Sequence, residues 1–165
     1  MYKASSNLII VISLKFKTIF LVFVSKFSNV MSGETKIEIL LRSMQPLLSS
    51  EEYVFCSLQL QDVKNSDLNP VGTFQEKEGL TLILTKKEAD RHQLTYSAIF
   101  SMITLEVYSS LEAVGFIAAI ASLLAQHNIS VNPVSAYYHD HLFIPVARSR
   151  EAMSLLQEFS KSSRN

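Results

Sequence analysis

The order of elements expected from Ile99 onward constrains the fold of this chain more than any other feature of its sequence. Residues 99–109 alternate between apolar and polar side chains, which is typical of a strand with one buried face. A helical pattern follows to about His127, then a strand over 129–138, a tight turn at His139-Asp140, and a strand over 141–146. A final helix is expected to begin with Ser149 as its cap. This β-α-β-β-α order lacks only a closing strand to become the βαββαβ unit of ferredoxin-like folds.

The closing strand has to come from elsewhere, because only a polar tail follows Phe159. The first half of the chain offers strands for this purpose, since several of its segments are rich in β-formers. Its expected elements are a helix over 35–45, strands over 52–60, 73–75 and 80–85, a loop over 61–70, and a helix over 86–92 with Thr85 as its N-cap. We therefore expect an α+β fold of two ferredoxin-like (βαββαβ) units that share antiparallel sheet interactions.

Residues 1–30 differ from the rest because they combine long apolar runs with lysines and no acidic residue. Lys15 and Lys17 stand near the middle of the apolar run, where each costs about 2.5–3.5 kcal/mol in a membrane-spanning helix. No small-residue cleavage site follows, which argues against a secretory signal. Two interpretations remain: a membrane-surface segment, or an extension upstream of a true start at Met31. We favour the second, with domains over 31–97 and 98–162.

Charge and cysteine content exclude several kinds of function. Fifteen basic and fifteen acidic residues cancel, so no basic excess favours nucleic acid as a partner. The single cysteine, Cys56, rules out an internal disulfide and a cysteine-based metal cluster, and fits a reducing, cytoplasmic compartment. No phosphate-binding glycine loop or nucleophile elbow is present in the sequence. We expect no cofactor and no enzymatic activity.

The segment from Ser109 to Phe116 is the first candidate for a ligand site. Ser109 and Glu112 form an S-x-x-E pattern, which predicts a capping box at the start of the helix, with Leu111 and Val114 on its buried stripe. A helix N-terminus offers unpaired N–H groups and a partial positive charge, both of which suit a carboxylate. Gly115, expected in the first turns of this helix, either lets a ligand approach or allows a tight helix–sheet contact.

Several segments resemble a small bacterial family of proteins with two ACT domains in tandem. In the second half they are SSLEAVGF at Ser109, Asn128-Ile-Ser, and YYHDHLFIP at Tyr137; in the first half they are MSGE at Met31, EEYVF at Glu51 and EGLTLIL at Glu78. The resemblance covers about Met31 to Ser160 and leaves residues 1–30 outside. ACT domains generally bind amino acids or similar small effectors where two ACT units meet, in the turn between the first strand and first helix. The resemblance therefore implies a regulatory protein that senses such an effector and acts through a homo-oligomer or a partner protein.

The polar run His139, Asp140 and His141 allows three interpretations. As a metal or hydrolytic site it lacks further ligands and a nucleophile, and the expected turn would separate the two imidazoles. In a second interpretation Asp140 makes the turn and the histidines form a polar rim. In a third that rim lines the effector pocket, where His141 meets a carboxylate and Asp140 an amino group.

Taken together, these features give one set of candidate ligand-binding residues. The set is Ser109, Ser110, Leu111, Gly115, Phe116, Asn132, His139, Asp140 and His141. Asn132 joins it because it is a polar residue in a hydrophobic strand. A ligand-free interaction module, which pairs with another chain through an exposed sheet edge, is a further alternative.

Overall fold

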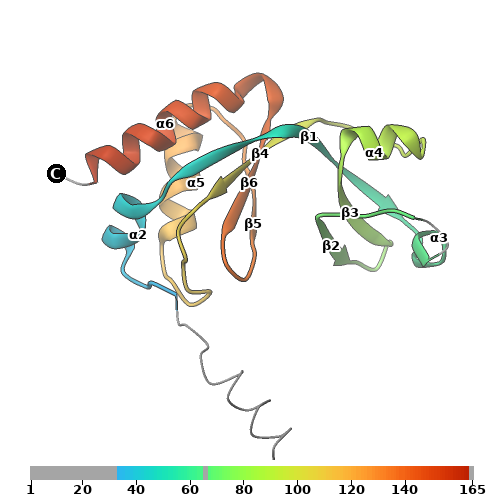
Figure 1. The fold of residues 1–165 in the computed structure, drawn as a ribbon, viewed down its shortest axis with the longest axis horizontal. Coiled ribbons are helices and arrows are strands. Elements are labelled where there is room, and N and C mark those ends of the chain that lie inside the picture. Colours follow the sequence, from blue (N-terminus) through green and yellow to red (C-terminus); the bar gives the residue numbers. More distant parts are fainter. Residues whose placement is uncertain (1–32, 65–66, 164–165) are drawn as a thin grey trace, which may run out of the picture. The chain divides into compact units, whose positions relative to one another are not determined.

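The computed structural model describes residues 33–64 and 67–163, so the expectations for residues 1–30 lie outside the described residues. The helices are α2 (Ile37–Ser43), α3 (Leu60–Lys64), α4 (Lys86–Arg91), α5 (Phe116–Gln126) and α6 (Ser149–Ser162), with a 3-10 turn at Val146–Arg148. The strands are β1 (Pro46–Leu58), β2 (Gly72–Gln75), β3 (Leu80–Thr85), β4 (Phe100–Leu105), β5 (Asn132–Ser135) and β6 (Asp140–Pro145) (Figure 1). Within these ranges, no helix combines the length and the apolar character that crossing a membrane requires.

The described strands form one antiparallel sheet in the order β2-β3-β1-β4-β6-β5. The first unit consists of β1, β2 and β3 closed by β4, and the second of β4, β5 and β6 closed by β1. The start of β1 supplies the missing strand, because Pro46 to Leu48 pair with Leu105 to Ile103. After a register shift between Leu48 and Glu52, the same strand pairs with β3 from Tyr53 to Leu58. This arrangement confirms the expected α+β fold of two ferredoxin-like units.

Helices cover one face of this sheet and an aromatic cluster occupies the other. Helices α2, α5 and α6 share a core with β4 and β6, which contains Leu40, Phe116, Leu124, Leu156 and their buried neighbours (Figure 1). Helix α4 packs through Ala89 on Val54 and Leu84. On the opposite face the ring of Phe55 lies 5.2 Å from that of Phe143 and 5.5 Å from that of Phe100. Helix α2 thus packs with the second unit, although the domain boundary at 97/98 places it in the first.

Several local predictions are confirmed. Strand β3 has its expected limits, and Thr85 caps α4 because its hydroxyl accepts a hydrogen bond from the Glu88 N–H at 3.3 Å.

Other local predictions are wrong. A short helix, α3, begins at Leu60 and occupies the first part of the expected loop 61–70. Ser149 is the first residue of α6 rather than its cap, since its hydroxyl donates to the Val146 carbonyl of the preceding 3-10 turn at 2.9 Å. The turn of the second hairpin spans Ala136–His139, where the Ala136 N–H donates to the His139 carbonyl at 3.1 Å. Asp140 therefore begins strand β6 and does not make the turn.

Candidate functional site

The connection between β4 and α5 does not form the expected capping box. Helix α5 begins at Phe116, so Ser109 and Glu112 both precede it. The Ser109 hydroxyl instead donates to Asp140 Oδ2 at 2.8 Å, a partner 31 residues away. With the later start, the buried face of α5 carries Phe116, Ile120 and Leu124. Leu111 and Val114, expected on the buried stripe, are 66% and 86% exposed.

Gly115 lies at the N-cap of α5 and not within its first turns. Its φ of 91° is in the left-handed region, which a side chain disfavours. A Cβ at this position would also lie 3.2 Å from Cδ1 of Ile37. The glycine is therefore explained by the sharp turn of the chain into α5 and by its contact with α2.

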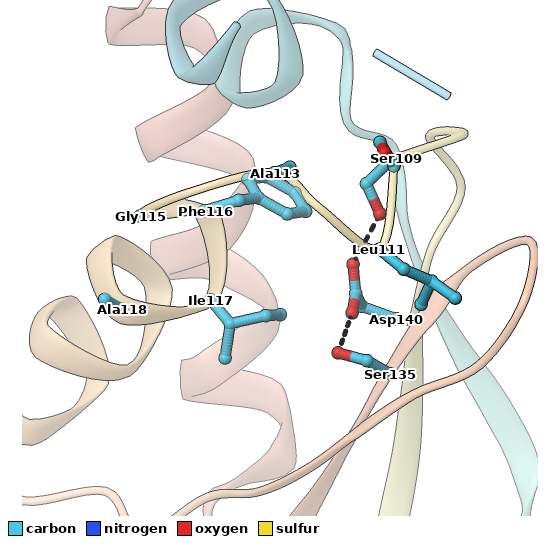
Figure 2. Close-up of a pocket in the computed structure, with 10 residues that line it drawn as sticks. Ser109, Leu111, Ala113, Gly115, Phe116, Ile117, Ala118, Ser135 and Asp140 are labelled. Carbon is cyan, nitrogen blue, oxygen red and sulfur yellow. Dashed lines mark hydrogen bonds between the residues drawn. The ribbon is translucent and has the colours of Figure 1, made fainter. Parts of the chain in front are cut away.

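This connection, the start of α5 and the β5–β6 hairpin surround a hollow of about 440 Å³, including its open mouth. Figure 2 shows Asp140 between Ser109 and Ser135 on one side of the hollow, with Gly115 and the first turn of α5 across from it. The lining residues are Ser109, Ser110, Leu111, Ala113, Gly115, Phe116, Ile117, Ala118, Ser135 and Asp140. The structure thus brings together six of the nine predicted site residues: Ser109, Ser110, Leu111, Gly115, Phe116 and Asp140.

Asp140 is a buried carboxylate at the edge of this hollow, with only 4% of its surface exposed. Asp140 pairs with Leu105 on β4 and with Ser135 on β5. Because paired residues share a face of the sheet and Leu105 belongs to the core under the helices, the Asp140 side chain lies on the helix-covered face. One oxygen accepts from the Ser109 hydroxyl and the other from the Ser135 hydroxyl. A carboxylate offers about four acceptor positions, so these two bonds leave it able to accept from a further donor.

The N-terminus of α5 forms the opposite wall. The helix has no side-chain cap and no acidic residue in its first turn. Its first intrahelical bond joins the Ala119 N–H to the Gly115 carbonyl. The N–H groups of Phe116, Ile117 and Ala118 come before that bond, and all three residues line the hollow. The positive end of the helix dipole is therefore not compensated by a side chain of the helix itself.

The other three predicted residues lie outside the hollow. Side chains alternate along the β5–β6 hairpin, so Asn132 and His141 lie on the sheet face opposite to Asp140. The Nδ1 atom of His141 is 3.0 Å from Thr104 Oγ1, and burial, with a smaller effect of His139, lowers the pKa of this imidazole below its ordinary value. His139 lies in the turn, with Nδ1 3.4 Å from the Val107 carbonyl. Within residues 33–64 and 67–163, no three His, Cys, Asp or Glu side chains are grouped to hold a metal ion.

Sequence reasoning missed Ser135, which binds Asp140, because the turn was expected at His139-Asp140 and lies at 136–139. A hairpin turn over 136–139 would have paired Ser135 with Asp140. Ala113, Ile117 and Ala118 also line the hollow and were missed for a different reason. They are apolar, and only the observed start of α5 places them beside the hollow.

The first unit does not reproduce this arrangement. Its strand β1 ends at Leu58 and α3 starts at Leu60, so Gln59 alone connects them, whereas residues 106–115 connect β4 to α5. The register equivalent of Asp140 is Leu80, since Leu80 pairs with the last residue of β1 as Asp140 pairs with the last residue of β4. The first unit therefore has an apolar side chain where the second has a carboxylate.

Comparison with known families gives two matches, each to a family described as an ACT domain, over residues 32–101 and over residues 98–158. Together they cover well over half of the chain. No curated protein matches it.

Three solved structures illustrate the similarity. A Vibrio cholerae protein of unknown function, described as a possible transport protein, is 46% identical, with 74% of this chain and 94% of that chain covered and a TM-score of 0.67. An Agrobacterium tumefaciens protein is 13% identical over 71% and 89% of the two chains, with a TM-score of 0.56. The regulatory subunit of aspartate kinase from Thermus thermophilus is 7% identical over 70% and 95%, with a TM-score of 0.54. The last two share the fold alone.

Proposed function

Since the chain belongs to the ACT-domain family, with two such domains in tandem, we propose that it is a regulatory protein that binds a free amino acid in the hollow beside α5. One observation carries this proposal. An uncompensated helix N-terminus and a buried carboxylate face the same small hollow. These are complementary to the two charges of a zwitterion.

The carboxylate of the amino acid would bind at the start of α5. There the N–H groups of Phe116, Ile117 and Ala118 precede the first intrahelical bond, and the helix dipole favours a negative charge. The α-ammonium group would donate to Asp140, whose two oxygens are held in place by the hydroxyls of Ser109 and Ser135. Because water has limited access to Asp140, this charged hydrogen bond would be stronger than one at the surface.

Size and lining also favour a small metabolite. Pockets for drug-sized ligands have volumes of about 300–1,000 Å³. Without its open mouth, this hollow has a volume of about 130 Å³, which is smaller than any of these. Leu111, Phe116 and Ile117 provide apolar contacts for a side chain.

We assign the site a binding role and not a catalytic one, with no cofactor. Among the described residues, Asp140 is the only ionisable side chain that lines it, and this group already accepts from the hydroxyl of Ser109. The unpaired thiol of Cys56 is buried, and burial raises its pKa, which suits a structural thiol in the reducing cytoplasm.

The regulatory output would pass through a second copy or a partner protein that covers the mouth of the hollow. Support comes from exposed apolar side chains on the two loops that border it. Leu111 and Val114 lie on the β4–α5 connection, and Tyr137 and Tyr138 lie on the β5–β6 turn. Exposed aromatic and aliphatic groups that gather in one place are typical of protein–protein interfaces.

Thermal unfolding of the full chain with each of the twenty amino acids tests this function. A ligand at 100 times its Kd stabilises the folded state by about 2.7 kcal/mol, which raises the Tm by several degrees. The matching N-acetyl amino acid and the decarboxylated amine each lack one charge and should give little or no shift. If none of the twenty amino acids raises the Tm, the chain does not have this function.

A further inference from the structure

We propose that the two residues Gly33 and Glu34, which precede α2, position the β4–α5 connection and so set the geometry of the candidate ligand site. The role of this pair in binding rests on the proposed function, whereas its role in holding the connection stands on contacts within the chain. Neither residue lines the hollow.

The pair forms a short parallel bridge with the connection, Glu34 opposite Ser109. The Glu34 N–H donates to the Tyr108 carbonyl at 2.9 Å, and the Ser110 N–H donates to the Glu34 carbonyl at 2.9 Å. Ser109, between these two bonds, donates its hydroxyl to Asp140. A displacement of the bridge would therefore also move the hydroxyl that holds the buried carboxylate.

Gly33 makes this approach possible because it has no side chain. A Cβ at this position would lie 2.5 Å from the carbonyl carbon of Ser109 and 2.5 Å from the nitrogen of Ser110. Both atoms belong to the backbone, which cannot rotate away as a flexible side chain can. Any other residue at position 33 must push the connection away from the start of α2.

The same segment also contacts the far end of the connection. Glu34 Oε1 accepts from the N–H groups of Thr35 and Lys36, both at 2.8 Å, and these bonds also lower the pKa of the Glu34 carboxyl. The chain then enters α2, whose first residue, Ile37, has its Cδ1 atom 3.2 Å from the position that a Cβ on Gly115 would occupy. The segment from Gly33 to Ile37 thus touches both ends of the connection, at Ser109-Ser110 and at Gly115. Its position sets how far Asp140 stands from the α5 N-terminus.

Gly33→Ala in the full chain tests this inference, with Gly72→Ala as its matched control. At Gly72 a Cβ would meet only the flexible side chain of Ile83, at 3.2 Å. We expect hydrogen exchange at the Ser110 amide to accelerate at least tenfold in the first variant while the amides of β4 and β6 keep their protection. The control should leave the Ser110 amide unchanged.

Two further measurements complete the test. With a mixture of the twenty L-amino acids as the probe, Gly33→Ala should lose most of the thermal shift that Gly72→Ala retains. Should Gly33→Ala not fold, Ile37→Ala replaces it, with faster exchange expected at the Gly115 and Phe116 amides. Unchanged exchange across 108–116 in the folded variant overturns the inference. If the wild-type chain shows no thermal shift, the proposed function fails, and the exchange rates still decide whether Gly33 and Glu34 hold the connection.

Discussion

Replacing Asp140 by asparagine separates the charge of the candidate site from its shape. The amide keeps the size of the carboxylate, and the hydroxyls of Ser109 and Ser135 can rotate so that one donates to the amide oxygen and the other accepts from its NH₂ group. Two charge-assisted hydrogen bonds become neutral ones, which costs about 1–3 kcal/mol, and the removal of a buried charge offsets part of that cost. The fold should therefore persist, with a moderately lower free energy of unfolding.

Ligand binding should change far more than stability. Loss of the buried charged partner of the ammonium group weakens binding by about 2–5 kcal/mol, or roughly 30- to 5,000-fold in Kd. Isothermal titration with the amino acid found in the thermal screen measures this change. The analogue without the amino group should bind Asp140→Asn no more weakly than it binds wild type, and His141→Asn, on the opposite sheet face, should bind the amino acid normally. A Kd for Asp140→Asn within threefold of wild type would refute the assignment of Asp140 to the ammonium group.

Three further predictions concern the glycine at the helix start, the buried histidine and the number of sites. Gly115→Ala should lower the free energy of unfolding by about 1–3 kcal/mol, because alanine is strained at a φ of 91°, and should weaken ligand binding; denaturant unfolding that matches wild type would contradict this. The pKa of His141 is lowered in the folded chain, so the unfolded chain binds more protons near pH 6. The part of the stability that depends on neutral His141 should therefore be fully present above the ordinary histidine pKa of about 6.5 and decline as the pH falls below it. In thermal melts at successive pH values, His141→Gln should make this decline shallower. Because Leu80 replaces the carboxylate in the first unit, native mass spectrometry should find one amino acid per chain, and two per chain would show that the units are equivalent after all.

Much of the fold could be predicted from local patterns. Strand β3 follows from its run of β-forming residues, helix α4 from its N-cap Thr85, and helix α6 from apolar periodicity. All of these signals act within a few positions of each other. The need for a closing strand also followed from the order of elements. Its origin in Pro46–Leu48 did not, because strand pairing over more than fifty positions leaves no local signal.

The candidate site, too, could be predicted only in part from local patterns. The segment from Ser109 to Phe116 could be singled out because serines, a glycine and a helical pattern adjoin there, and this depended on the sequence alone. The capping box failed because a serine hydroxyl can bond either to its own helix or to a distant carboxylate, and tertiary structure brings Asp140 within 2.8 Å.

What the sequence by itself determined was therefore the alternation of strands and helices and the segment that carries the site, since both depend on neighbouring residues. Only the tertiary structure decided which side chains share the hollow. It placed Asp140 and Ser135 inside it and His141 and Asn132 outside, because a shift of the hairpin turn by a residue or more changes which side chains of a strand face the helices. It also brought Gly33 against Ser109, through a contact that depends on the position of α2 over the second unit and on no pattern near either residue.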